Sequence, residues 1–353
     1  MEDIKKVLSI ITERAKKKKK ISCFFIGNTK KLENVNYYIT PIRENERFIF
    51  SSCIVFNNNT AKKIAKIVDG KVDYILVDTE KKIKTKKNKL LGLTNIERSV
   101  KESIKKSKLR VYKANDLSVF SAETLINNYF LKDKRGVGGK KVLIIGLGNI
   151  GFKISLKLVE NGANVFLFRR NQNKLLNLKN AINNIKPSAT ISKALLLKKA
   201  PKNFKNFDII VGSSDQSEII NYTQVKGVRK KTLVIDIGKG NFSEDAIRYL
   251  IQNRVNIFRL DVTSSYFSYL DNLLYTEKIY DKKNYILNKN SITFVSTGIL
   301  GQKNDVIVDD VNHPKLIYGI CDGKGKFIQI DNLKKKNEIM KIYKLTGFKL
   351  IYE

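Results

Sequence analysis

The chain has 353 residues, of which 42% are hydrophobic and 29% are charged. This length predicts more than one domain, and this composition is typical of a soluble globular protein, which excludes wholesale disorder. No apolar run reaches the roughly 18 residues that a membrane-spanning helix needs.

The formal net charge of +35 raises the question of a nucleic-acid ligand. Of the 68 basic residues 12 are arginine, which leaves 56 lysines, whereas arginine is the residue that pairs bidentately with phosphate and guanine. The lysines are also spread along the whole chain. We therefore expect a small-molecule ligand in preference to nucleic acid, and no membrane partner.

The cysteines and the N-terminal segment indicate a compartment. Cys23, Cys53 and Cys321 lie far apart and form no C-x-x-C spacing, which is typical of a reducing environment. The N-terminus places apolar residues before the lysine run 16–20, the reverse of a secretory signal. These features predict a cytoplasmic protein and leave open whether it forms a homodimer.

The first part of the chain predicts a parallel α/β domain over residues 1–131, because a basic helix over 1–20 is followed by alternating strands and helices. One helix is predicted from Thr60, with Thr60 as its N-cap, and two more from Asn95 to Ser107 and from near Ser118 to Tyr129. The predicted strands cover residues 21–26, 48–56, 72–77 and 109–112.

A polar, glycine-containing stretch over 132–140 predicts a domain boundary, and a second domain over 136–265 follows it. Its order of elements is that of a doubly wound parallel sheet, the Rossmann architecture. Strands are predicted at 142–145, 165–168, 208–211, 232–237 and 256–260, and helices at 152–160 and near 243–252. Residues 266–353 are expected to form a small, irregular, strand-rich C-terminal region, with strands at 292–295, 306–308, 316–320 and 327–330 before a basic helix.

The turn between the first strand and helix of the central domain reads Gly-Leu-Gly-Asn-Ile-Gly, a G-x-G-x-x-G pattern. The first glycine permits the tight turn, the second lets the backbone approach a pyrophosphate, and the third lets helix and strand pack closely. The helix N-terminus then presents N–H groups to the phosphates. We therefore predict dinucleotide binding rather than a purely structural turn, through Gly146, Gly148, Asn149, Ile150 and Gly151.

The second strand of this unit ends in Arg169 and Arg170, where domains that bind NAD carry an acidic residue. A guanidinium pairs with the 2′-phosphate of NADP and stacks on adenine. The pair therefore predicts NADP as the cofactor and leaves NAD open. The alternative is that both arginines only end a strand at the surface.

Two segments resemble parts of known enzymes. Residues 168–174, Phe-Arg-Arg-Asn-Gln-Asn-Lys, resemble the N-R-T-x-x-(K/R) cofactor loop of shikimate dehydrogenases and glutamyl-tRNA reductases, and Ala114-Asn115-Asp116 is similar to the N-T-D motif of shikimate dehydrogenases. In that family the aspartate of this motif, with a lysine of the first domain, holds the hydroxyl that is oxidised. The resemblance implies a catalytic role for Asp116, and the alternative is that Asp116 caps the following helix.

The segment that supplies that family's lysine, N-V-T-x-P-x-K, is not found in residues 1–110. Lys113 is the candidate because it directly precedes the Ala-Asn-Asp turn, and the alternative is a solvated amine.

Residues 208–215 and 232–240 resemble strand ends of the wider amino-acid-dehydrogenase-like group, which includes adenosylhomocysteinase. Both turns follow parallel strands, where open α/β sheets bind ligands. The resemblance, which covers about residues 110–265, implies that Gly212 and Ser213 approach the nicotinamide ribose and that Gly238, in the turn 236–238, lies beside the ring. The alternative is ordinary turn chemistry.

A metal centre is not expected. His313 is the only histidine and lies in a turn before a proline, so neither a multi-histidine metal site nor a Ser-His-Asp triad has the residues it needs. Asp305, Asp309 and Asp310 are interpreted as solvated loop carboxylates.

These patterns lead to one hypothesis and two alternatives. The hypothesis is an NADP-preferring oxidoreductase that transfers a hydride between nicotinamide and a small polar, acidic hydroxy/keto or amino/imino substrate. The first alternative is a dinucleotide-binding sensor or scaffold protein without turnover. The second is a basic nucleic-acid-binding protein, whose affinity would fall steeply with salt.

Overall fold

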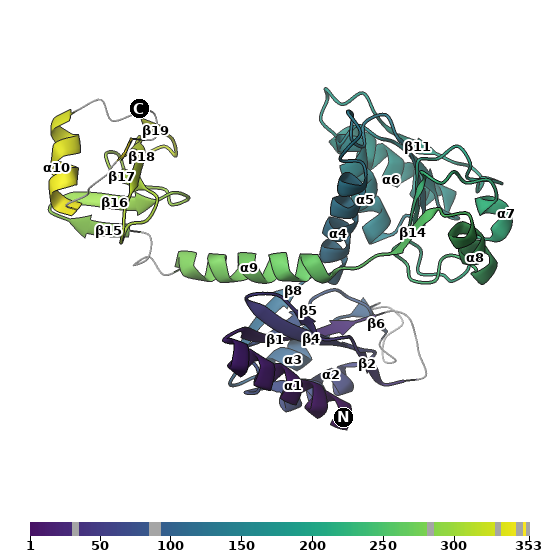
Figure 1. Cartoon of the computed structure of the whole chain (residues 1–353), viewed down its shortest axis with the longest axis horizontal. Coiled ribbons are helices and arrows are strands. Elements are labelled where there is room, and N and C mark those ends of the chain that lie inside the picture. The colour runs from purple at the N-terminus through teal and green to yellow at the C-terminus, as the bar shows by residue number, and fades with distance from the viewer. Residues whose placement is uncertain (30–34, 85–92, 281–285, 329–332, 344–348, 351–353) are drawn as a thin grey trace. The chain divides into compact units, whose positions relative to one another are not determined.

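The structure is a computed structural model that describes residues 1–29, 35–84, 93–280, 286–328, 333–343 and 349–350. The chain divides into two compact units, residues 1–267 and residues 268–353 (Figure 1). The first unit contains two large sheets built around parallel strands, which we call the N-terminal sheet and the Rossmann sheet.

The N-terminal sheet has the strand order β2-β4-β1-β5-β8, with the short β3 paired to β4. The four neighbouring strands β4, β1, β5 and β8 are parallel, whereas β2 and β3 run antiparallel to β4. The carboxyl ends of the parallel strands therefore meet at one edge of the sheet. The strands are β1 Ile21–Asn28, β2 Tyr37–Ile39, β3 Arg43–Glu44, β4 Phe48–Val55, β5 Tyr74–Asp78 and β8 Lys108–Tyr112.

Three helices cover one face of this sheet: α1 Glu2–Lys18, α2 Asn58–Val68 and α3 Glu97–Lys101 (Figure 1). Alternate strand residues point to opposite faces of a sheet, and every second residue of β4 faces these helices. Ile49, Cys53 and Val55 belong to that core, whereas the intervening Phe50 packs its ring against other aromatic rings. The second face of β4 is thereby free to line a site.

Three expectations about the helices of this region are wrong in detail. Asn57, not Thr60, is the N-cap of α2, because its side chain accepts the Thr60 N–H at 2.8 Å. The helix predicted from Asn95 to Ser107 contains only the five residues of α3, after which backbone N–H groups of 105–107 donate to Asp69. The next helix, α4 Ala114–Tyr129, begins four residues earlier than expected.

The early start of α4 also changes the interpretation of Asp116. Lys113 occupies the N-cap position and makes no side-chain capping bond, while Asp116 lies within the first turn. Asp116 is therefore not the N-cap. A carboxylate in the first turn still interacts favourably with the helix dipole.

The Rossmann sheet confirms the predicted doubly wound architecture. Its strand order is β11-β10-β9-β12-β13-β14, and every pairing is parallel. A parallel sheet covered on both faces needs nearly continuous apolar strands, which these sequences supply. The strands are β9 Lys141–Ile145, β10 Asn164–Phe168, β11 Ala194–Leu196, β12 Ile209–Gly212, β13 Leu233–Asp236 and β14 Asn256–Arg259.

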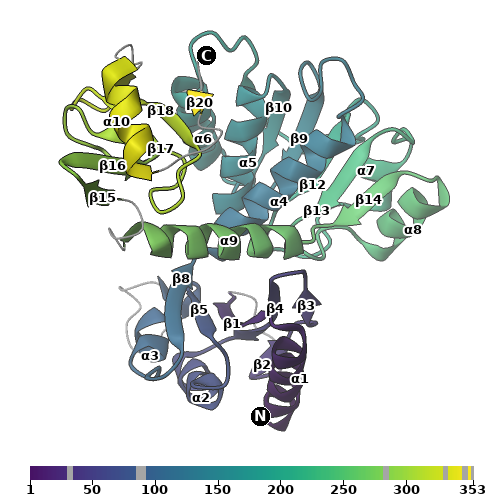
Figure 2. The same ribbon diagram turned by 60° about the vertical axis from the view of Figure 1, so that its left-hand side comes forward.

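Helices pack on both faces of the Rossmann sheet (Figure 2). Val142 and Ile144 of β9 face a core shared with α4, α5 and α6, whereas Leu143 and Ile145 face a core shared with α7 and α8. The sequence did not predict α6 or β11, and α5 begins at Asn149 rather than at residue 152. The helices are α5 Asn149–Glu160, α6 Gln172–Ile185, α7 Tyr222–Val225 and α8 Glu244–Gln252.

The predicted irregular start of the C-terminal region is wrong, because α9 forms a helix over Thr263–Tyr280. The second unit then has a mixed sheet of order β15-β16-β17-β18-β19, with β20 beside β18 (Figure 2). Ile339 of α10 lies in the core of this unit. Residues 329 and 330 of one predicted strand lie outside the described residues. The elements are β15 Ile286–Lys289, β16 Ile292–Ser296, β17 Val306–Val308, β18 Leu316–Cys321, β19 Phe327–Ile328, α10 Leu333–Tyr343 and β20 Lys349–Leu350.

No helix in the described ranges combines the length and the apolar character that crossing a membrane requires.

Candidate active site

The glycine turn connects β9 to α5 and leaves no room for side chains at two of its positions. Gly146 has a φ of +96°, and a β-carbon there would lie 2.5 Å from the backbone nitrogen of Ser214. A β-carbon at Gly151 would lie 2.3 Å from the carbonyl oxygen of Gly146. These two glycines therefore let the turn pack against β12 and let α5 begin close to the sheet.

Gly148 differs from its neighbours because a β-carbon there would meet no atom of the described chain within 4 Å. It is the N-cap residue of α5 and makes no side-chain capping bond. The first N–H groups of α5 are thus available to an anion, and the space beside Gly148 is where a phosphate could approach them.

Arg169 follows β10 and extends over the glycine turn, where its Nη1 donates to the carbonyl oxygen of Leu147 at 2.5 Å. Arg169 is half-buried, whereas Arg170 is exposed. The next residue, Asn171, caps α6 by accepting the Lys174 N–H at 2.9 Å. Both arginines therefore lie between the end of β10 and the residue that caps α6.

The end of β12 lies against the glycine turn because the chain order of the sheet reverses between β9 and β12. Ser213 Oγ donates to the carbonyl oxygen of Gly146 at 2.6 Å. A β-carbon at Gly212 would lie 2.9 Å from Asn241 Oδ1, and one at Gly238 would lie 2.3 Å from the carbonyl oxygen of Ser214. Such a reversal point is where open α/β sheets bind their ligands.

A cavity of about 2010 Å³ lies within the first unit, over the carboxyl ends of both parallel sheets. Ligand pockets of drug-sized molecules occupy roughly 300–1,000 Å³, so this cavity has room for a larger ligand together with a small one. Eight of the predicted cofactor residues line it: Gly146, Gly148, Asn149, Ile150, Arg169, Arg170, Ser213 and Gly238. Gly151 and Gly212 do not line the cavity and instead support the turns behind it.

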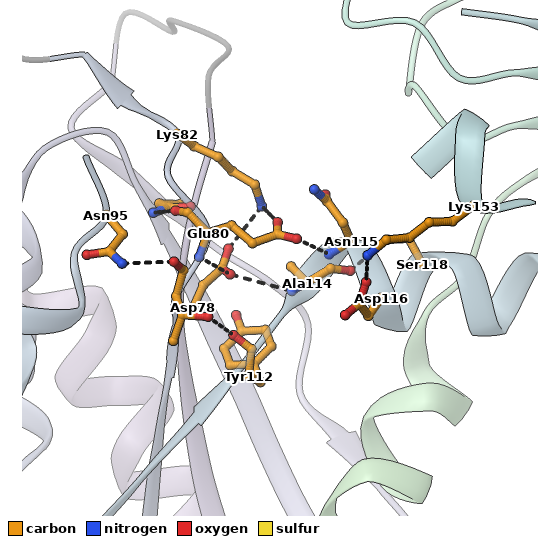
Figure 3. Close-up of polar contacts among 12 residues, drawn as sticks. Asp78, Glu80, Lys82, Asn95, Tyr112, Ala114, Asn115, Asp116, Ser118 and Lys153 are labelled. Atoms are coloured by element: carbon orange, nitrogen blue, oxygen red, sulfur yellow. Dashed lines mark hydrogen bonds and ion pairs between the residues drawn. The ribbon is translucent and has the colours of Figure 1, made fainter. Parts of the chain in front are cut away.

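The opposite wall of the cavity contains a charged cluster that the sequence did not indicate (Figure 3). Lys82 Nζ lies 3.0 Å from Asp78 Oδ2 and 2.6 Å from Glu80 Oε2. The Lys82 side chain is 14% exposed, and the Asp78 side chain is fully buried. Lys82 and Glu80 line the cavity, so a half-buried ammonium held between two carboxylates is in reach of a ligand.

The cluster is held in place from three sides. Asn28, at the end of β1, donates from Nδ2 to the carbonyl oxygen of Glu80 at 2.9 Å, and Asn95 donates to that of Thr79 at 2.8 Å. At the start of α4, the Asn115 N–H donates to Glu80 Oε1 at 3.3 Å. Burial raises the pKa of Glu80 above its ordinary value, and the charge of Lys82 opposes that rise only in part.

Asn28 carries an unused acceptor beside this cluster. The residue is 4% exposed and lines the cavity, and no donor among the residues that the structure describes reaches its Oδ1. A buried carbonyl oxygen without a donor costs free energy, which a ligand hydroxyl or ammonium could recover.

The structure separates the two predicted catalytic residues. Lys113 lines the cavity with an exposed side chain. Asp116 does not line it, and its carboxylate forms an ion pair with Lys153, which does (Figure 3). The catalytic role of Asp116 and Lys113 therefore stays a prediction, and neither residue reaches the cluster around Lys82.

One signal could have identified Lys82. The carboxyl end of a parallel strand is where ligands bind, and residues 78–82 directly follow the strand predicted at 72–77. In a chain with 68 basic residues, however, no single lysine is conspicuous. Only the fold shows that this lysine is half-buried between carboxylates.

The remaining candidates have structural surroundings. His313 is exposed, and Asp305, Asp309 and Asp310 each accept backbone N–H groups of nearby turns. Within the described ranges, no three His, Cys, Asp or Glu side chains are grouped so that they could hold a metal ion.

Comparison with protein families gives one match: residues 131–248, a third of the chain, match the family described as shikimate / quinate 5-dehydrogenase. This segment contains the glycine turn, Arg169 and the end of β12. The match and the strand order agree, so the chain has the fold of the NAD(P)-binding Rossmann dehydrogenases. At this coarse level both support an oxidoreductase.

Comparison with curated proteins finds no match. Among solved structures, the chain is similar to the A chain of dipicolinate synthase from Bacillus subtilis, with 14% identity, coverage of 74% of this chain and 97% of that one, and a TM-score of 0.34. A shikimate dehydrogenase in complex with NADP+ is 12% identical, with coverage of 68% of this chain and 84% of that one, and a TM-score of 0.37. The L-tryptophan dehydrogenase of Nostoc punctiforme is 11% identical, with coverage of 61% of this chain and 59% of that one, and a TM-score of 0.39. The fold assignment rests on the family match and on the strand order.

Proposed function

We propose that the chain is an NADP-preferring oxidoreductase that transfers a hydride between the nicotinamide and a small polar, acidic substrate of the hydroxy/keto or amino/imino type. Residues 136–265 bind the dinucleotide, residues 1–131 bind the substrate, and residues 266–353 form an extension. The observation that carries this proposal is that the glycine turn and the Lys82 cluster open into the same cavity.

The residues of the glycine turn fit a dinucleotide. The free space at Gly148 and the uncapped start of α5 suit a pyrophosphate. Ser213 and Gly238 line the cavity farther along the sheet, where the nicotinamide end would lie. When bound, the nicotinamide supplies or accepts the hydride.

Lys82 is the group that we assign to proton transfer. Its Nζ can donate a proton to, or accept one from, the oxygen or nitrogen of the substrate. Asp78 and Glu80 fix the position of this ammonium, and a fixed donor loses less entropy when the substrate binds than a mobile one does. The fully buried Asp78 also restricts Lys82 to this side of the cavity.

The preference for NADP is supported by the position of Arg169. Its bond to the Leu147 carbonyl holds the guanidinium over the glycine turn, beside the end of β10, where the adenosine ribose lies in this fold. A phosphate on that ribose would pair with the planar fork. Arg170 adds a second positive charge at the same edge of the cavity.

Asp116 and Lys113 keep secondary roles in the proposal. The carboxylate of Asp116 holds Lys153 at the cavity wall, and Lys113 adds positive charge near the start of α4. Both would assist the binding of an acidic substrate.

The test is NADPH oxidation by the full chain with a panel of oxo-acids and imines, followed by absorbance. Lys82→Met should lower turnover by roughly 10²- to 10⁴-fold, the usual contribution of a general acid or base, while NADPH affinity stays unchanged. Lys113→Met is the matched control and should lower turnover only slightly. Tight NADPH binding without turnover of any substrate would instead support the dinucleotide sensor.

A further inference from the structure

The wall of the cavity that is formed by β2, β3 and β4 differs in charge from the wall at β5. Phe50, Ser52 and Ile54 share one face of β4 and line the cavity. Arg43 of β3, which is paired in register with Phe50, lines it as well. This wall presents a guanidinium and hydroxyl groups, whereas the wall at β5 presents two carboxylates and one ammonium.

Arg43 is held by a neutral partner. Its Nε donates to Thr263 Oγ1 at 2.8 Å, and the Thr263 hydroxyl in turn donates to Asp261 Oδ1 at 2.6 Å. Among the described residues, no carboxylate lies within ion-pair distance of Arg43, and its two terminal nitrogens have no hydrogen-bond acceptor. A half-buried guanidinium in this state retains its capacity for a bidentate anion.

The neighbouring carboxylate does not neutralise Arg43. Successive residues of a strand point to opposite faces, and Glu44 accordingly faces away from the cavity. There it pairs with Lys18 and Lys20, both at 2.7 Å. The charge of Arg43 is therefore directed only toward the cavity and toward the network of Thr263 and Asp261.

Two hydroxyl groups complete this wall. Thr40 Oγ1 and Ser52 Oγ lie 2.6 Å apart, and Thr40 Oγ1 also accepts the Ser52 N–H at 3.1 Å. Both residues line the cavity. Since only one of the two hydroxyl protons is needed for the bond between them, the pair can donate one hydrogen bond to a ligand.

We infer that Arg43, with the hydroxyl pair of Thr40 and Ser52, forms a subsite for the carboxylate of the substrate. This inference rests on the proposed function and assigns an orientation to it. The carboxylate binds at the β3–β4 wall, and the reacting carbon points toward Lys82. Because β4 and β5 flank β1 and β3 lies beyond β4, Ser52 is two strand spacings from β5 and Arg43 is three, roughly 10 and 14 Å, so the subsite and Lys82 can hold opposite ends of a small acid.

The experiment measures binding of two isosteric probes, 4-fluorobenzoate and 4-fluorobenzamide, to the full chain by fluorine NMR line broadening. Saturating NADP+ keeps the probes away from Arg169 and Arg170, and the titration is repeated without NADP+. We expect the benzoate to bind and the benzamide to bind at least tenfold more weakly. Arg43→Gln should weaken benzoate binding about tenfold or more, because it removes a charged hydrogen-bond donor to the carboxylate.

Two variants control for structure and for charge. Thr263→Val removes the bond that holds Arg43 but keeps the guanidinium, and Arg259→Gln removes another cavity-lining arginine. Both should leave benzoate affinity within about threefold of the wild type. Arg43→Lys retains a positive charge and should keep part of the benzoate affinity that Arg43→Gln loses. It also serves as the test variant if Arg43→Gln does not fold.

Two results would overturn the subsite: benzoate binding that survives Arg43→Gln, or no preference for benzoate over benzamide. Absence of NADP+ binding would count against the proposed function alone, because the titration without NADP+ still decides the subsite.

Discussion

The two parallel sheets of the first unit contribute to one cavity by different means. The Rossmann sheet uses backbone: its turn excludes side chains at Gly146 and Gly151 and leaves open space at Gly148. The N-terminal sheet uses side chains: Lys82, Glu80 and Arg43 line the cavity from neighbouring strands. A dinucleotide needs close approach of the backbone, whereas a small substrate needs charges and protons at fixed positions.

This difference predicts how each wall responds to substitution. In a backbone site the ligand or the neighbouring chain occupies the space of the missing side chain, so one added methyl group should have a large effect on folding or on cofactor affinity. A side-chain site depends on its charged and hydrogen-bonding groups, so removing such a group should have a larger effect than removing a residue that only holds it.

The largest effect is expected at the glycine turn. Gly151→Val should abolish cooperative folding of the Rossmann domain, because its β-carbon would lie 2.3 Å from the carbonyl oxygen of Gly146. Gly148→Ala should fold normally, since nothing of the described chain lies within 4 Å of its β-carbon, but should bind NADPH at least about tenfold more weakly. Thermal unfolding and NADPH titration measure the two. Equal melting temperatures for both variants would contradict this account of the turn.

The same contrast explains what the sequence could predict. The fold of the central domain and its glycine turn follow from local patterns, because glycines at fixed spacing between a strand and a helix are a short-range constraint. The position of Arg169 at a strand end is local in the same sense. The sequence also predicted β1, β4, β5 and β8 of the N-terminal sheet from their apolar residues, but not the short strands β2 and β3.

The substrate wall could not be predicted because its residues meet only after folding. Arg43 pairs with Thr263, which is 220 residues away, and Asn28 reaches Glu80 across 52 residues. Residue type gives no help either, because 56 of the 68 basic residues are lysines and Lys82 does not stand out among them. The sequence likewise missed α9, whose hydrophobic residues do not follow a simple helical period.

The next largest effect concerns the phosphate of the cofactor. Arg169→Ala should weaken NADPH binding by roughly 10- to 100-fold, the range for hydrogen bonds to a charged group, and should change NADH affinity far less. Parallel titrations with NADPH and NADH measure the ratio of the two dissociation constants. Arg170→Ala, at the exposed neighbour, is the control and should shift the ratio less. An unchanged ratio in Arg169→Ala would remove the preference for NADP.

A smaller effect is expected at Asp116. Its partner Lys153 is 36% exposed and Asp116 itself 46%, and exposed ion pairs contribute little. Asp116→Asn should therefore lower turnover only a few-fold, whereas a catalytic acid or base would contribute roughly 10²- to 10⁴-fold. Steady-state kinetics beside Lys82→Met decide between these values. A loss as large as that of Lys82→Met would return the catalytic role to Asp116.

The smallest effect is a pH dependence of the cluster that follows β5 of the N-terminal sheet. Burial raises the pKa of Glu80 above its ordinary value of 4.5, so the stabilisation from its protonated form is complete below pH 4.5 and is lost as the pH rises through the folded-state pKa. Glu80→Gln has no such loss. The free energy of unfolding of this variant, measured with urea relative to the wild type, should therefore increase above pH 4.5.

Glu44→Gln supplies a control of opposite sign from the same sheet. Hydrogen bonds from Lys18 and Lys20 lower the pKa of Glu44 to about 2, so its stabilisation is complete above pH 4.5 and is lost as the pH falls toward 2. Relative to the wild type, Glu44→Gln should be less stable at neutral pH and should approach it in acid. If Glu80→Gln followed the same direction, attraction to Lys82 would outweigh burial at Glu80, and the cluster would act as an ordinary ion pair.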